Sequence, residues 1–215
     1  MTFARLLRRP RIVLGLLSLA VLLIPLLAAA ADLPVLPSGA LHWDAVRPVG
    51  WGDFRAVPPA DAARRTEIAA IAMTISWSLR FEVTCVPGKS EWKGSIVPSS
   101  LRVLNWMDPA RSWAALERRS EAVLRHEQRH FDLNEVYRRK LELTLVPLRA
   151  AGPDAEGAKR SLDAMIHAAA QKLLDTLAAQ QDRYDLETSH GASVEGQARW
   201  DAQIVLWLVD PAKAP

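Results

Sequence analysis

The chain changes its hydrophobic period halfway along its length. From Met73 to Cys85 apolar and polar residues alternate strictly, which predicts a half-buried strand, or two strands joined by a bend. The segments 92–97 and 101–106 follow a predicted turn and are short antiparallel strand candidates. Residues 32–59, rich in Pro and Trp, predict an irregular segment that lies over the core. The strands are therefore expected in the N-terminal half.

The C-terminal half follows the helical period instead. Asp108 and Ser112 are candidate N-caps of a long helix that continues to Leu145. A second long helix is predicted from about 154 to 184, and a short third helix from 197 to 208. We expect an α+β fold, in which N-terminal antiparallel strands pack on two long helices.

The first 31 residues have the composition of an export signal. Arginines precede an apolar run over 12–27, and the alanines at 28–31 offer cleavage sites. Alternatively, residues 12–31 remain as an uncleaved inner-membrane anchor. We expect a bacterial protein that is periplasmic or secreted, with one domain over 32–215 and with membrane contact only if the leader is retained.

Charge and cysteine content narrow the class of partner. Of the 27 basic residues, the four arginines at 5, 8, 9 and 11 belong to the leader, so the remainder has 23 basic and 24 acidic residues. This balance, together with export, disfavours a nucleic-acid partner. The one cysteine, Cys85, excludes an internal disulfide, and its place in the alternating pattern predicts a buried, inert thiol.

The first long helix carries a metal-binding pattern. His126 and His130 stand four residues apart, so a helix places both imidazoles on one face, where they can bind one zinc ion. Glu127 is offset by about 100° and can act as general base without ligating the metal. Zinc lowers the pKa of a bound water to about 7, which suits hydrolysis of an amide. The motif therefore predicts a zinc metalloprotease with one Zn²⁺ per chain.

A catalytic zinc needs a third protein ligand and an open position. Spacing alone leaves a downstream histidine or carboxylate as candidates: His190, Glu156, Asp185 and Glu187. Near these residues Tyr184 is a candidate hydrogen-bond donor to the oxyanion, or alternatively a buried structural tyrosine. Asn134, Asp132 and Asp185 are candidates for holding the ligands in place.

Two sequence blocks together resemble a known family. They are HEQRHFD over 126–132 and YDLETSHG over 184–191, followed by Gln197 and Trp200 and preceded by WGDF over 51–54. This combination resembles the DUF922 family of predicted secreted bacterial zinc-dependent proteases. The resemblance implies a zincin-like peptidase and favours His190 as the third zinc ligand, with Glu187 as the alternative.

The residues and the resemblance together predict an exported zinc-dependent metallopeptidase. It would hydrolyse a protein or peptide substrate by zinc-activated water, with Glu127 as base, and an edge strand between Met73 and Trp106 would bind the extended substrate. One alternative is a non-catalytic envelope binding protein in which zinc staples the helices. A second is a metal-free helical adaptor.

Overall fold

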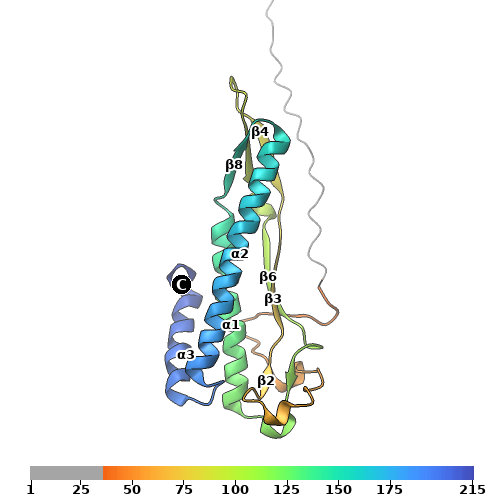
Figure 1. Ribbon diagram of the computed structural model, residues 1–215, viewed down its shortest axis with the longest axis vertical. Coiled ribbons are helices and arrows are strands. Elements are labelled where there is room, and N and C mark those ends of the chain that lie inside the picture. Colours follow the sequence, from red (N-terminus) through yellow and green to blue (C-terminus); the bar gives the residue numbers. More distant parts are fainter. Residues whose placement is uncertain (1–35) are drawn as a thin grey trace, which may run out of the picture.

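The computed structural model describes residues 36–215, so the predicted leader at 1–31 lies outside the described residues. Within this range three helices pack beside small antiparallel sheets in an elongated molecule (Figure 1), which confirms the α+β class. No helix in residues 36–215 is both long enough and apolar enough to cross a membrane.

A long β-hairpin forms most of the strand layer. Its outgoing arm comprises β2 (Ala69–Ala70), β3 (Met73–Ser78) and β4 (Phe81–Cys85), and its returning arm comprises β5 (Trp92–Ile96), β6 (Arg102–Met107) and β7 (Trp113–Ala114). The pairs are β4–β5, β3–β6 and β2–β7, all antiparallel. β1 (Leu41–His42) adds to β6, and β8 (Arg149–Gly152), which the sequence did not predict, adds to β5. The strand predicted over 73–85, with its bend, is confirmed.

The first helix, α1 (Glu121–Leu145), begins later than the sequence predicted. Its N-cap is Ser120, whose hydroxyl accepts the backbone N–H of Val123. The predicted start at Asp108 or Ser112 is wrong because this stretch belongs to the hairpin. The Ser112 hydroxyl accepts the N–H of Ala72, and the residues that follow form β7.

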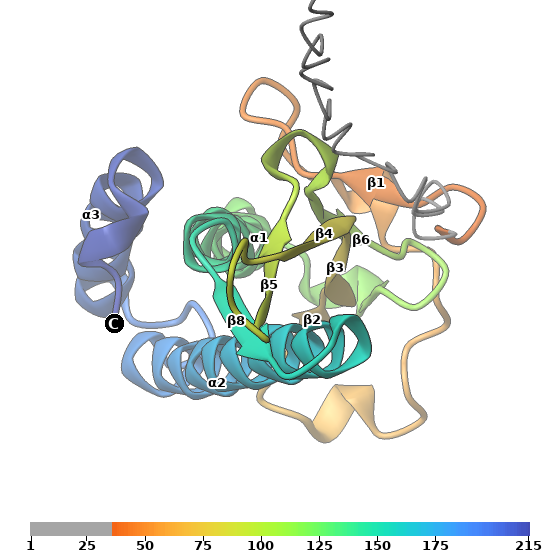
Figure 2. The same ribbon diagram turned by 90° about the horizontal axis from the view of Figure 1, so that it is seen from above.

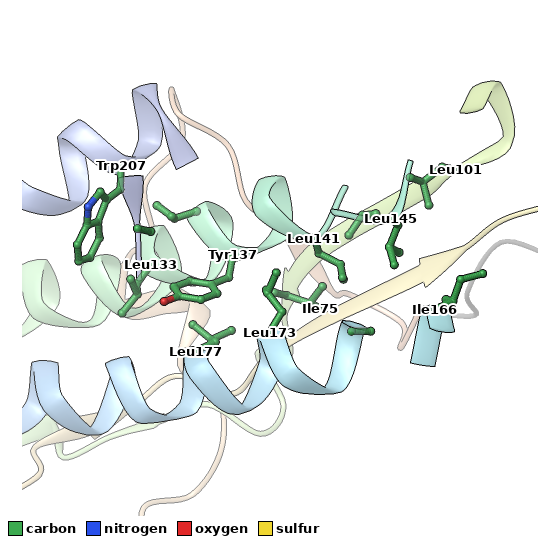
Figure 3. Packing of buried hydrophobic residues seen from close by; sticks show 14 of the residues in the cluster. Ile75, Leu101, Leu133, Tyr137, Leu141, Leu145, Ile166, Leu173, Leu177 and Trp207 are labelled. Atoms are coloured by element: carbon green, nitrogen blue, oxygen red, sulfur yellow. The ribbon is translucent and has the colours of Figure 1, made fainter. Parts of the chain in front are cut away.

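The second helix, α2 (Ala155–Thr188), begins where the sequence predicted, with Asp154 as its N-cap, and ends four residues later than predicted. α3 (Val194–Val209) follows a short turn. α2 packs against both α1 and the sheet that contains β8 (Figure 2). The main core lies between these layers (Figure 3) and is formed by buried side chains that include Ile75, Leu133, Tyr137, Leu141, Leu173, Leu177 and Trp207. Burial of each large apolar side chain contributes about 1.5–3 kcal/mol, so this core fixes the position of α2 relative to α1.

A second apolar cluster lies under the N-terminal segment. Val49 and Phe54 pack there with Met107, Val123 and Phe131. Residues 36–59 are irregular apart from β1 and one helical turn, and they cover this cluster as predicted.

The prediction of a buried thiol at Cys85 is wrong. Cys85 is exposed because it is the last residue of β4, beside the hairpin turn, where the alternating pattern continues beyond the packed core.

Candidate metal centre

Two histidines of α1 and one aspartate of α2 bring three metal-binding atoms together. The Nε2 atoms of His126 and His130 lie 3.0 Å apart. Asp185 Oδ1 lies 3.0 Å from His126 Nε2 and 2.9 Å from His130 Nε2. Among the described residues, these three form a group whose ligand atoms are all close enough to share one cation.

The donor set fits a small divalent metal. Two imidazole nitrogens and a carboxylate oxygen are ligands that zinc takes in proteins. Donor atoms that each lie about 2.0–2.1 Å from a tetrahedral zinc ion are about 3.3 Å apart, close to the separations seen here. Both histidines are buried, and their Nε2 atoms face one another and the carboxylate rather than solvent. The residues present therefore fit a metal ion.

His126, His130 and Asp185 form the metal-binding triad, and the pKa of each depends on the charges of the groups around it. Burial alone would raise the pKa of Asp185, but hydrogen bonds from His126 and His130 lower it well below its usual range. Burial lowers the pKa of His126, whereas for His130 the hydrogen bond to Asp185 and the nearby charge of Glu127 outweigh burial and raise the pKa. The positive charge of His130 also contributes to the lowered pKa of His126.

Glu127 lies beside the triad without joining it. Its side chain is buried, which raises its pKa to about 7, and its Oε2 accepts the backbone N–H of Ile71 at 3.0 Å. Glu127 and the triad line a cavity of about 230 Å³, whose opposite wall is formed by residues 67–71 and Met73. The motif carboxylate and the metal-binding atoms thus face one cleft.

His190 lies at the same cleft but outside the group of mutually close atoms. Its Nδ1 is 3.3 Å from Asp185 Oδ1, and its side chain is 29% exposed. Asp185, which the sequence left as one carboxylate alternative and as a support for the ligands, is the third member of the group. Ligation by His190 stays a prediction.

The turn after α2 explains the glycine of the YDLETSHG block. Ser189, His190 and Gly191 all have positive φ, at 50°, 51° and 83°. A Cβ added to Gly191 would lie 2.9 Å from the Cβ of His126. The turn therefore packs directly on the first histidine of the motif, and only glycine fits there without strain.

Glu187 and Tyr184 point away from the three metal-binding atoms. Glu187 accepts hydrogen bonds from Arg183 and from the indole N–H of Trp200. Tyr184 is fully buried, and its hydroxyl donates to the carbonyl of His126. Tyr184 stacks on the His126 ring and does not line the cleft, which favours the structural role for this residue.

Asp132 and Asn134, which the sequence predicted to hold the metal ligands in place, form hydrogen bonds elsewhere in the fold. Asp132 accepts hydrogen bonds from the indole of Trp43 and from Arg129, so it anchors the N-terminal segment. Asn134 donates to Asn105 of β6 and so joins α1 to the sheet. Neither residue contacts the metal-binding atoms.

Sequence reasoning missed Gln181, which lies within 2.6 Å of His130. Its position four residues before Asp185 places both on one face of α2, and this spacing was the available signal.

The comparisons with known proteins agree with the sequence blocks. A family model described as "Bacterial protein of unknown function (DUF922)" matches residues 54–191, more than half of the chain. Neither the curated proteins nor the solved structures include a match. The matched range contains the triad, Glu127 and the turn at 189–191. The chain belongs to the DUF922 family of bacterial proteins of unknown function.

Proposed function

We propose that this protein is an exported, zincin-like, zinc-dependent peptidase that acts on protein or peptide substrates. The observation that carries the proposal is the meeting of His126, His130 and Asp185 in one cleft that Glu127 also lines. An HExxH helix with a third donor and an adjacent carboxylate is the arrangement that metal-assisted peptide hydrolysis requires.

Each residue of the cleft has a role in this proposal. His126, His130 and Asp185 would hold the zinc ion. When bound, zinc supplies Lewis acidity, which acidifies a water molecule and polarises a carbonyl group. Glu127 accepts the proton of the attacking water and transfers it to the nitrogen of the leaving amine. Its buried position, with a pKa near 7, suits a group that both accepts and returns a proton.

The wall opposite the triad supplies a place for an extended substrate. The carbonyl of Ile68 accepts from Ala115, on the returning arm of the hairpin, whereas the N–H of Ile71 donates to Glu127. Because successive residues of a strand point to opposite sides, the backbone groups of Ala69 and Ile71 face away from β7 and toward the cleft. An extended peptide can pair with this edge beside Glu127. In this proposal the substrate-binding edge is formed by residues 69–71, before the range between Met73 and Trp106 in which the sequence predicts it.

One observation favours the alternative of a zinc-stapled binding protein. His190 Nδ1 lies only 3.3 Å from the Asp185 oxygen that faces the two histidines. If His190 also ligated the metal, four protein ligands would close the site, as in structural zinc centres.

Zinc content and hydrolysis of a labelled unfolded protein test the proposal together. We expect one zinc per chain in the wild type, loss of zinc in His126→Ala and Asp185→Ala, and retained zinc with lost hydrolysis in Glu127→Gln. His167→Ala is the matched control, because His167 is an exposed histidine of α2. Absence of zinc from the wild type would overturn the metal centre. Hydrolysis by Glu127→Gln at the wild-type rate would overturn the peptidase.

His190→Ala separates the two candidate functions. In the peptidase, this variant keeps most of its zinc because three other side chains hold the ion. In the binding protein, it loses zinc as severely as His126→Ala does, and the wild type hydrolyses nothing.

A further inference from the structure

Two glutamines, the half-buried Gln181 and the buried Gln197, contact the far sides of the metal-binding histidines. We infer that Gln181 and Gln197 are positioning residues, which hold both imidazoles in the tautomer that directs the Nε2 lone pairs at the metal. The inference rests on the proposed metal centre and extends it to α3, which lies beyond the range that the family model matches.

Gln181 of α2 fixes His130. Its Oε1 lies 2.6 Å from His130 Nδ1, and its Nε2 donates to the backbone carbonyl of the same histidine at 3.1 Å. A carbonyl can only accept, so the second bond identifies which end of the amide carries hydrogens. The amide oxygen therefore faces Nδ1 and requires a hydrogen there. In the neutral imidazole that binds a metal, Nε2 then keeps its lone pair. The hydrogen bond from His130 Nε2 to Asp185 needs a second proton, which the metal replaces.

Gln197 of α3 acts on His126 in the same way. Its Oε1 lies 3.3 Å from His126 Nδ1, while its Nε2 donates to Asp201 at 2.8 Å. A carboxylate is an acceptor, so the amide oxygen again faces the imidazole. Arg129 donates to the same Asp201 oxygen and holds the carboxylate in place.

A second acceptor at His126 Nδ1 agrees with this tautomer. Thr188 Oγ1 lies 3.4 Å from that nitrogen, but its hydrogen is donated to the carbonyl of Tyr184 at 2.7 Å. The hydroxyl therefore presents a lone pair to Nδ1. Both neighbours of His126 Nδ1 thus accept a hydrogen bond from it.

The consequence is a preformed pair of ligands. Metal-bound histidines usually donate their other N–H to an acceptor that fixes the ring, and loss of that acceptor typically weakens metal binding 10–100-fold. Without its glutamine, each ring can rotate or carry its hydrogen on Nε2, which blocks the metal. Here Gln181 of α2 orients His130, while Gln197 of α3 and Thr188 of α2 orient His126.

Glutamine-to-methionine variants test the inference, because methionine keeps the length of the side chain and removes its hydrogen bonds. Zinc affinity is measured by chelator competition, and Co²⁺ absorption reports the geometry of the ligands. We expect Gln181→Met and Gln197→Met each to raise the zinc Kd 10–100-fold and to change the Co²⁺ spectrum. The matched controls are Gln171→Met on α2 and Gln203→Met on α3, both exposed, which should remain within twofold of wild type.

The unfolding midpoint of the metal-free protein separates positioning from simple packing. Variants that lower this midpoint but bind zinc with the wild-type Kd and spectrum would overturn the inference while leaving the metal centre intact. A wild type that binds no zinc would overturn both. If the methionine variants fold poorly, Gln181→Asn and Gln197→Asn, which keep the amide but withdraw it by one methylene, should show the same loss of affinity.

Discussion

Replacement of Gly191 by alanine should weaken both the fold and the metal centre. The residue has φ of 83°, and an added Cβ would lie 2.9 Å from His126 Cβ and 3.2 Å from His126 Cγ. A left-handed conformation costs a non-glycine residue about 1–2 kcal/mol. The lower entropy of the unfolded alanine chain offsets about 0.4–1 kcal/mol of this cost. Overpacking adds about 1–3 kcal/mol, so we expect the free energy of unfolding to fall by about 1–4.5 kcal/mol.

Gly88 provides the matched control. It has φ of 74° in the hairpin turn, and nothing lies within 4 Å of an added Cβ. Gly88→Ala should therefore lose only the conformational part of the unfolding free energy, about 0–1.5 kcal/mol, and should leave zinc binding unchanged. The difference between the two variants measures the collision with His126 alone.

Urea unfolding of the metal-free proteins and zinc titration of the folded ones provide the measurements. Gly191→Ala should also raise the zinc Kd at least about tenfold, because a displaced His126 ring no longer points at the metal. Equal destabilisation by the two alanine variants, with unchanged zinc affinity in both, would refute the claim that the turn positions His126.

Three further predictions concern residues around the site. Tyr184→Phe removes the hydrogen bonds from the hydroxyl to His126 and Gln197, so it should lower the free energy of unfolding in urea by about 1–3 kcal/mol. It should reduce the rate of hydrolysis per bound zinc less than tenfold. A 100–1000-fold loss would instead support the oxyanion role. Asp132→Ala should lower the free energy of unfolding by about 2–4 kcal/mol and expose residues 36–59 to limited proteolysis. The exposed control Asp163→Ala should do neither. Equal protection from proteolysis in both variants would contradict the anchoring role of Asp132. Cys85 should react fully with a thiol reagent in the native protein without loss of zinc, and protection until unfolding would contradict its exposure.

The boundaries of α1 show where local pattern reading succeeded and where it failed. The helical period and the proline at 147 predicted that the helix ends at Leu145, and the structure confirms this. The start was misplaced because Asp108-Pro109 has the composition of a helix N-terminus, whereas Trp113 and Ala114 pair with residues more than 40 positions earlier. Such pairing leaves no local signature in a stretch of helix-forming residues.

The third member of the metal group shows the same limit. Asp185 and His190 lie five residues apart, and both types of side chain bind zinc. The helix continues through Asp185 and then turns through three left-handed residues, which leaves His190 on the rim. Spacing in the sequence does not report where a helix stops within one turn.

Features that depend on neighbours a few residues apart can be predicted from the amino-acid sequence. These are the alternation that forms β3 and β4, and the four-residue spacing that places His126 and His130 on one helix face with Glu127 beside them. Which distant residues meet these histidines depends instead on how the helices pack in three dimensions. Asp185, Gln181 and Gln197 reach them because burial of the core fixes how α2 and α3 lie against α1. Backbone hydrogen bonds enforce local periods, whereas contacts between helices depend on the summed packing of many side chains.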